Sequence, residues 1–179
     1  MRSNSKRKNL LDAASYLVEH EGMENLTLEA VANKAGVSKG GLLYHFPSKD
    51  ALIKGMINEY SKAFIEDVRT RSNDASDSIG KWHRAYLESA LKDEESSNKL
   101  ITAYVASLFT DPVFLSKIDE EYHEISDEMA TDGLDPVEAA IIRLAIDGLW
   151  YSGIFNVGKL NHELKQKVIE RLLEMTKQQ

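Results

Sequence analysis

The sequence predicts an all-α protein. Apolar residues recur every three or four positions along most of the chain, which is the helical period. The 179 residues include only 3 prolines, and the alternation typical of β-strands is nearly absent. Short Ser, Thr, Asn or Asp signals precede the periodic segments, as expected of helix N-termini.

Charge is distributed unevenly along the chain. The net charge is −7, yet residues 1–49 hold seven Lys/Arg against five Asp/Glu and carry +2. The remaining 15 basic and 24 acidic residues leave −9 on the rest. This asymmetry predicts a basic head on an acidic body, and an acidic body discourages non-specific coating of DNA.

Composition excludes several other classes. The chain has no cysteine, which excludes disulfides, thiolate metal sites and cysteine nucleophiles. The charged N-terminus lacks the apolar region of a signal peptide. The longest apolar-rich stretch, Ala139–Val157, contains Arg143 and Asp147 and so predicts a buried helix, not a membrane span. We therefore expect a cytoplasmic protein with no membrane partner.

The first three helices are marked by local signals. Lys6–Glu21 has apolar residues on one face and is followed by Gly22, a plausible C-terminal cap. Thr27 is placed to cap a second helix. Gly36 then interrupts the pattern, and Ser38 begins a third helix that ends near Phe46.

Two short helices around a glycine turn have the form of a helix-turn-helix, whose second helix enters the major groove of DNA. Ser38 and Lys39 could donate to bases or phosphate, while Gly40 and Gly41 remove side-chain bulk where backbone must approach DNA. Each glycine disfavours a helix by about 1 kcal/mol relative to alanine, so a helix built only for packing would rarely contain two. The alternative is an ordinary helical hairpin with a glycine turn.

Residues around this motif are candidates for phosphate contacts. Thr27 lies at a helix N-terminus, where backbone N–H groups and a hydroxyl favour an anion. Lys49 falls in the first turn of the helix after Pro47, where the helix dipole does not stabilise a positive charge. Tyr44 and His45 carry polar ends that can bind phosphate, although His45 could equally be a half-buried packing residue.

Residues from about 7 to 56 resemble the DNA-binding domain of the TetR/AcrR family of transcriptional regulators. The resemblance covers a little over a quarter of the chain and is specific because its features occur in order. Leu43 stands where many members carry a tyrosine, and the aromatic residue here is Tyr44. The resemblance runs through Ala13-Ala14, Thr27–Ala32, Ala35–Leu42 and Tyr44–Leu52.

The resemblance implies a three-helix DNA-binding head, residues 1–48, which a fourth helix connects to a larger ligand-binding and dimerisation body, residues 49–179. The apolar pattern from Lys49 to about Arg71 fits this connector, and Arg71–Ser78 is the segment most typical of a loop. The resemblance also implies that the last two long helices of two subunits form a four-helix bundle. Gly148, Ser152 and Gly153 are small residues that permit such close helix packing.

The sequence of the body predicts five further helices. We expect them at 79–91, 98–109, from Pro112 to about 130, from Pro136 to Gly158, and from Asn161 to the end, with a solvated break at Lys92–Ser97.

Many large aromatic residues in the body suggest a small-molecule site between helices. Asp147 lies within the apolar sequence LAIDGLWYSGIF, where an unpartnered carboxylate would be costly to bury. It could bind a cationic or hydrogen-bond-donating ligand, or it could simply pair with Arg143 one turn earlier. The aromatic residues could likewise only fill the core. The candidate ligand-binding residues are Trp82, Tyr86, Tyr104, Phe109, Trp150, Tyr151 and Asp147.

Catalytic chemistry finds little support in the sequence. Glu120 and His123 have the spacing of a helical di-iron ligand pair, but the second Glu-x-x-His motif that such a site needs is missing. His123 and Asp127 could hold a metal, yet a solvated charged face is the simpler interpretation. We therefore expect no enzyme, no catalytic residue, no metal and no cofactor.

We interpret the chain as a homodimeric, ligand-responsive repressor that binds a palindromic double-stranded DNA operator and is released by a small-molecule effector. A dimeric helix-turn-helix protein matches its two-fold axis to such an operator. The alternative is a helical dimer that binds small molecules or proteins and no longer recognises DNA.

Overall fold

The structure is a computed structural model that describes residues 2–76, 79–95 and 112–177. This described part contains eight α-helices, one short 3₁₀-helix and no strand, which confirms the expected all-α class. It forms two compact units, whose boundaries lie inside helices α4 and α7, between residues 61 and 62 and between residues 116 and 117. The two units are described separately below.

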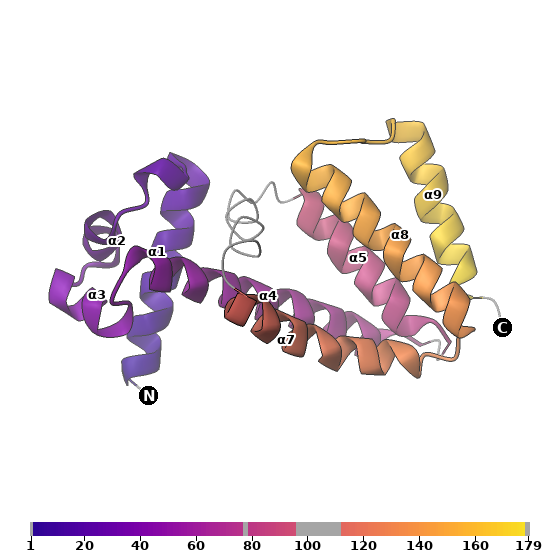
Figure 1. Ribbon diagram of the computed structural model, residues 1–179, viewed down its shortest axis with the longest axis horizontal. Coiled ribbons are helices and arrows are strands. Elements are labelled where there is room, and N and C mark those ends of the chain that lie inside the picture. The colour runs from indigo at the N-terminus through magenta and orange to yellow at the C-terminus, as the bar shows by residue number, and fades with distance from the viewer. Residues whose placement is uncertain (1, 77–78, 96–111, 178–179) are drawn as a thin grey trace. The chain divides into compact units, whose positions relative to one another are not determined.

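The first unit contains α1 (Arg2–Glu21), η1 (Met23–Asn25), α2 (Leu28–Ala35), α3 (Lys39–His45) and the beginning of α4 (Lys49–Asp74) (Figure 1). Helix α1 packs against α2, and α2 packs against α3. Helix α1 ends at Glu21 as expected but begins four residues earlier than Lys6. The core of this unit is made by Leu10, Leu11, Ala13, Ala14, Leu17, Val18, Leu26, Val31, Ala32, Leu42, Phe46, Leu52 and Met56.

The starts of α2 and α3 are those expected from the sequence. The Thr27 hydroxyl oxygen accepts a hydrogen bond from Ala30 N–H at 3.1 Å, which caps α2. Gly36 ends α2 in the left-handed conformation, with φ 67°, where a side chain would be strained.

The second unit contains the rest of α4 together with α5 (Lys81–Glu95), most of α7 (Pro112–Ala130), α8 (Pro136–Phe155) and α9 (His162–Met175). Helix α5 lies beside α8, and α8 contacts α9 (Figure 1). The expected starts at Pro112, Pro136 and Asn161 are confirmed, whereas α8 ends at Phe155, before Gly158. The core contains Ile65, Val68, Trp82, Ala85, Tyr86, Leu87, Ala90, Ile125, Met129, Leu134, Ile142, Ile146, Leu149, Ile169 and Leu172.

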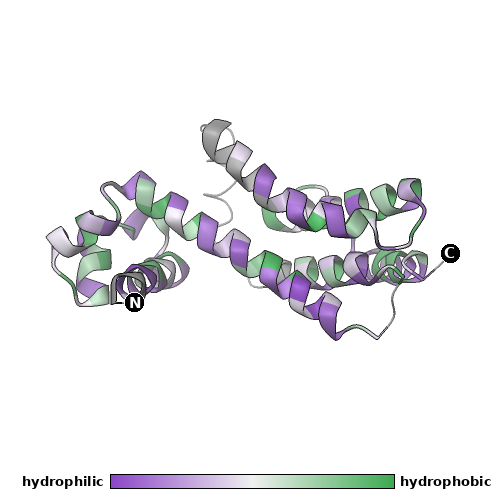
Figure 2. Cartoon of the chain, turned by 90° about the horizontal axis from the view of Figure 1, so that it is seen from below, coloured by the Kyte–Doolittle hydropathy of each residue, from purple (hydrophilic) through white to green (hydrophobic). Residues whose placement is uncertain are grey.

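Hydrophilic residues are interspersed with hydrophobic ones along the helices of both units (Figure 2). None of the helices in the described ranges combines the length and the apolar character needed to cross a lipid bilayer.

Helices α4 and α5 are both longer than the sequence predicts. Helix α4 continues to Asp74 into the expected loop, and α5 continues to Glu95 into the expected break. The extra turns are supported by Asp67 on α4, which accepts hydrogen bonds from Arg71 at 2.7 Å and from Ser89 at 2.8 Å. Lys92 of α5 also donates to Asp67, at 2.7 Å. Burial would raise the pKa of Asp67, but these donors outweigh it and hold the pKa well below its usual range.

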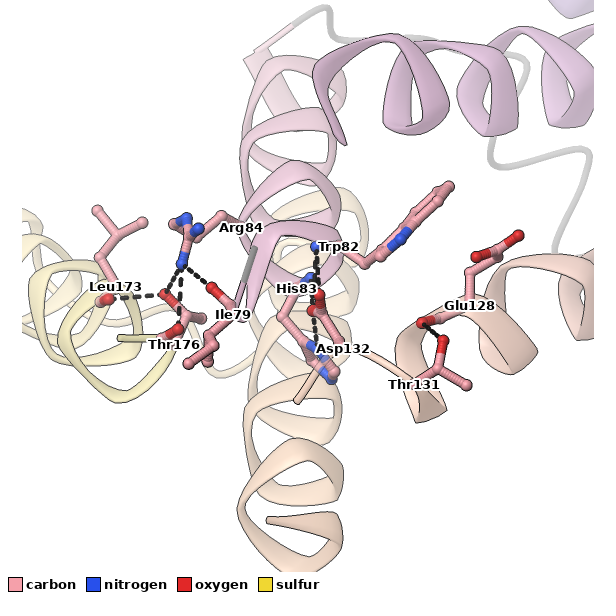
Figure 3. Close-up of polar contacts among 9 residues, drawn as sticks. All are labelled: Ile79, Trp82, His83, Arg84, Glu128, Thr131, Asp132, Leu173 and Thr176. Carbon is pink, nitrogen blue, oxygen red and sulfur yellow. Dashed lines mark hydrogen bonds and ion pairs between the residues drawn. The ribbon is translucent and has the colours of Figure 1, made fainter. Parts of the chain in front are cut away.

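A buried carboxylate organises the start of α5. Asp132, in the turn between α7 and α8, accepts hydrogen bonds from the backbone N–H groups of Trp82 and His83, each at 3.0 Å (Figure 3). The ring Nδ1 of His83 lies 2.9 Å from the same oxygen and donates in the tautomer that this contact selects. Both side chains are almost fully buried. Asp132 therefore caps a helix at Trp82, 50 residues before it in the chain.

The same end of α5 is joined to the end of α9. The Arg84 guanidinium donates to the carbonyl oxygens of Ile79, at 2.8 Å, and Thr176, at 3.0 Å (Figure 3). Gly80 has φ 65°, and a Cβ atom there would lie 2.0 Å from the Thr176 carbonyl oxygen. Only glycine therefore fits where the chain passes the end of α9.

Replacing Asp132 tests how much this buried cap contributes to stability. We expect Asp132→Ala to lower the free energy of unfolding by about 3 kcal/mol, because it leaves buried N–H groups unpaired. Asp132→Asn keeps one acceptor oxygen and should lose about 1 kcal/mol. Asp135 caps α8 at an exposed position, so Asp135→Ala is the matched control, with an expected loss of about 1 kcal/mol. Urea denaturation measures all three, and an Asp132→Ala loss no larger than the control's would contradict the assignment.

Candidate DNA-binding surface and ligand site

Helix α3 is anchored on one side and open on the other. Leu42 and Phe46 are buried in the core of the first unit. Lys39, Gly40 and Gly41 are exposed in its first turn, and no other group lies within 4 Å of a Cβ atom built on Gly40. The helix thus presents backbone without side-chain bulk beside one lysine, as the sequence predicts for a helix that meets DNA.

The end of α3 presents an aromatic side chain to solvent. Tyr44 is 82% exposed, and its ring meets His45 edge-on with 5.0 Å between ring centroids. His45 is only partly buried. Leu43 is 38% exposed, so it lies at the margin of this surface and not in the core.

Three helix N-termini of the first unit carry hydroxyl caps. The Ser38 oxygen accepts from Gly41 N–H at 3.1 Å, and the Ser48 oxygen accepts from Ala51 N–H at 3.0 Å. Thr27 caps α2 in the same way. In each cap the oxygen is the acceptor, so the hydroxyl hydrogen remains able to donate to a phosphate oxygen. Lys49 is exposed at the first residue of α4, next to one of these caps.

In the second unit, three helices bring Asp147 together with two tyrosines. The Tyr86 hydroxyl, from α5, donates to the Asp147 carboxylate of α8 at 2.6 Å. Tyr122, from α7, donates to the same oxygen at 3.5 Å, and its hydroxyl is also hydrogen-bonded to that of Tyr86. Tyr86 is buried, whereas Tyr122 and Asp147 are partly buried.

The pKa values of this cluster reflect its burial. Burial raises the pKa of Asp147, and the hydroxyl of Tyr86, the charge of Arg143 and the hydroxyl of Tyr122 only partly oppose it. Burial raises the pKa of the Tyr86 and Tyr122 hydroxyls as well, with the nearby Asp147 adding to it, so both stay protonated donors. The pKa of Tyr151 is raised by burial and by Asp147.

Asp147 does not form the ion pair with Arg143 that was one of the two alternatives from the sequence. The guanidinium of Arg143 donates to the Ser126 hydroxyl at 3.5 Å, and its charge acts on Asp147 from a distance. Across the described ranges, the direct partners of the Asp147 carboxylate are tyrosine hydroxyls and include no cation.

The other candidate ligand residues are placed less closely. Trp82 is buried one turn before Tyr86, and Trp150 is partly buried. Tyr151 is 44% exposed, with its ring 5.0 Å from that of Trp150. Tyr104 and Phe109 lie outside the described residues.

Sequence reasoning missed Tyr122 and Phe64. The ring of Phe64 meets that of Tyr86 edge-on at 5.7 Å, and Tyr86 meets Tyr122 in the same way at 6.0 Å. Tyr122 falls in the acidic stretch before Ala130, and the charges of this stretch favoured its interpretation as a solvated face. Its spacing from Ile125 and Met129, both buried in the same core, is the helical signal that could have found it.

His123 contacts Asp119 at 3.4 Å, and both side chains are exposed. No group of three His, Cys, Asp or Glu residues in the described part of the chain is arranged to hold a metal ion.

Helix α8 buries only one of its faces, although the sequence predicts a buried helix. Ile142, Ile146 and Leu149 enter the core. A second stripe faces solvent at intervals of three, four or seven residues, with Leu144 64% exposed. Gly148 falls on the same stripe and has no other group within 4 Å of a built Cβ. The exposed stripe comprises Val137, Ile141, Leu144, Tyr151 and Phe155.

Two family models match this chain, one in its N-terminal part and one in its C-terminal part. Residues 10–56 match the model described as bacterial regulatory proteins, tetR family, and residues 80–177 match the tetracyclin repressor-like, C-terminal domain. The chain belongs to the TetR family of transcriptional regulators. TetR-family members are regulators and not enzymes, and they bind operator DNA and small-molecule effectors as dimers.

Among curated relatives, the regulator BetI of Stenotrophomonas maltophilia is 24% identical over 181 residues, which cover 91% of this chain and 88% of BetI. An uncharacterised regulator of Xanthobacter autotrophicus is 32% identical over 93 residues, or 52% of this chain and 45% of that protein.

Several solved structures share the fold. SCO7518 from Streptomyces coelicolor A3(2) has a TM-score of 0.69 at 18% identity, covering 93% of this chain and 97% of that one. The multidrug binding protein EbrR, in complex with imidazole, has a TM-score of 0.66 at 23% identity, covering 93% of this chain and 94% of that one.

The raised pKa of Asp147 predicts a pH-dependent stability. A carboxyl whose pKa is higher in the folded than in the unfolded state destabilises the fold once it is ionised. We therefore expect Asp147→Asn to be more stable than the wild type at pH 7–8. The difference should shrink as the pH falls through the raised pKa towards the unfolded value of about 3.9. Urea denaturation from pH 8 to pH 4 measures it, and a variant less stable at pH 7 would show that the ionised carboxylate is favoured.

Proposed function

We propose that this TetR-family regulator is a homodimeric repressor that binds a palindromic operator and is released by a small-molecule effector. Residues 1–48 serve as the DNA-binding domain, whose core is completed by Leu52 and Met56 at the start of α4, and residues 49–179 contain the ligand-binding and dimerisation domain. The proposal rests chiefly on the two sides of α3. Its apolar side is buried, while its other side presents Lys39, two glycines and Tyr44 to solvent.

Residues of α3 and its neighbours contact DNA in distinct ways. Ser38, Lys39, Gly40 and Gly41 face the base edges in the major groove. The phosphate contacts come from the surrounding positions, which are exposed or partly exposed: Thr27, Tyr44, His45 and Lys49.

The exposed apolar stripe of α8 forms the centre of the dimer interface. An apolar stripe on a helix whose other side is already in the core is typical of a protein–protein contact. Leu164 of α9 is 46% exposed and adds to it, whereas Ile169 and Leu172 of α9 lie in the core of the unit. The dimer thus uses the last two helices, with α8 contributing most of the apolar surface.

An effector in the body acts by favouring one arrangement of the two heads. A ligand shifts such an equilibrium only by its difference in affinity for the two states. Solved structures of EbrR are complexes with imidazole, malachite green and ethidium. We propose a comparable small-molecule site here, at Asp147 with the body aromatics Trp82, Tyr86, Tyr104, Phe109, Trp150 and Tyr151.

Selection of bound sequences from a random duplex pool tests the proposal. At physiological salt the purified protein should enrich a palindrome with two half-sites about one or two helical turns apart. Adding metabolite extract should release the enriched duplex. Recovery of no sequence, with and without extract, would favour the module that no longer recognises DNA.

Gly40 separates DNA binding from folding. Its built Cβ meets nothing within 4 Å, so both Gly40→Ala and Gly40→Trp should fold and dimerise. Alanine favours a helix over glycine by about 1 kcal/mol, so Gly40→Ala should be slightly more stable. Gly40→Trp should lose at least a hundredfold in affinity for the selected duplex because its ring occupies the space of the base edges. Fluorescence anisotropy measures both, and unchanged affinity of Gly40→Trp would place the contact elsewhere.

A charge on the α8 stripe tests the dimer. Leu144 is exposed within the unit, so Leu144→Glu should leave folding intact and convert the dimer to monomer. Asn73→Glu adds the same charge at an exposed position of α4 and is the matched control. Analytical ultracentrifugation measures both variants. A Leu144→Glu protein that stays dimeric would exclude this stripe from the interface.

A further inference from the structure

We propose that Asp147, Tyr86 and Tyr122 bind an organic cation carrying N–H donors, such as a protonated amine or amidine on an aromatic body, and that this is the effector class. The inference rests on the proposed function, because it assigns the chemistry of the ligand site in the body.

The first argument is charge. Asp147 carries a partly buried carboxylate on a helix that is otherwise largely apolar. Within the described part of the chain, its direct partners are neutral hydroxyls, while Arg143 donates to Ser126. A partly desolvated anion without a contacting cation is held at a free-energy penalty. An organic cation removes that penalty on binding, whereas an anionic ligand would increase it.

The second argument is hydrogen bonding. Each tyrosine hydroxyl has one hydrogen. Tyr86 donates its hydrogen to Asp147, and Tyr122 donates its own to Asp147 or to the Tyr86 oxygen, so what the two hydroxyls offer a ligand is oxygen lone pairs. The carboxylate likewise only accepts. Three acceptor groups from α5, α7 and α8 therefore converge at one point, and a group with several N–H donors satisfies them together.

The third argument is the aromatic surroundings. The ring of Tyr86 meets the ring of Phe64 on one side and that of Tyr122 on the other, both edge to face. Rings from α4, α5 and α7 therefore gather around the acceptor cluster. Aromatic rings attract cations through their quadrupole and bind flat apolar bodies by packing. A cation on an aromatic body uses both properties.

Full-length protein without DNA is titrated with benzylammonium, benzamidinium and ethidium at pH 7.5 by isothermal titration calorimetry. Benzyl alcohol, benzoate and benzyltrimethylammonium are the neutral, anionic and N–H-free counterparts of benzylammonium. We expect at least one of the three N–H cations to bind. If benzylammonium binds, its affinity should exceed those of benzyl alcohol and benzoate by at least tenfold. Its affinity should exceed that of benzyltrimethylammonium severalfold.

Variants show whether the binding uses this cluster. Asp147→Asn should fold, because burial disfavours the charge it removes, and should lose at least tenfold in affinity for the bound cation. Tyr122→Phe removes one acceptor oxygen and should lose severalfold. Asp127→Asn removes the same charge from an exposed position of α7 and should bind like the wild type.

Failure of all three cations to bind overturns the proposal, as does unchanged affinity in Asp147→Asn or equal binding of benzyl alcohol or benzoate. The random-duplex selection is performed on ligand-free protein and is independent of this titration. A protein that selects an operator but binds no cation remains a regulator with another effector class. A protein that binds cations through Asp147 but selects no DNA keeps this inference and loses the proposed function.

Discussion

The buried carboxylate of Asp132 fixes the body on which the ligand site depends. It binds the first backbone N–H groups of α5 and the ring of His83, and so holds the α7–α8 turn against the start of α5. Tyr86 lies one turn further along α5, while Tyr122 and Asp147 lie on the two helices that this turn connects. The convergence of the three acceptor groups therefore follows from where Asp132 places α5, α7 and α8.

The head has a different requirement from the body: α3 must be held firmly in place while its outer face exposes few side-chain atoms. Two glycines weaken the helix, yet the Ser38 cap and the buried Leu42 and Phe46 hold it in place. Backbone rigidity thus comes from residues at the helix start and on its inner face. The outer face is left clear for a partner, which is why Gly40 can be both unfavourable for the helix and suited to the surface.

Features set by local chemistry could be predicted from the sequence, and features set by distant partners could not. The caps at Thr27, Ser38, Asp135 and Asn161 follow from residues within three positions, so the helix starts were predictable. The ends of α4 and α5 were not, because polar residues that resemble a loop pair across helices through Asp67. The role of Asp132 was not predictable for the same reason, since its partner Trp82 lies 50 residues away in the chain.

Helix α4 supplies Leu52 and Met56 to the core of the first unit and Ile65 and Val68 to that of the second. A contact boundary that falls inside a continuous helix differs from one that falls in a linker, where few side chains are shared. Cutting the chain at Ser48 would leave the head without two of its buried residues and would give the body an unpaired apolar helix turn. Recombining heads and bodies of different relatives therefore needs the junction to fall after Met56, so that each core keeps its own part of the helix.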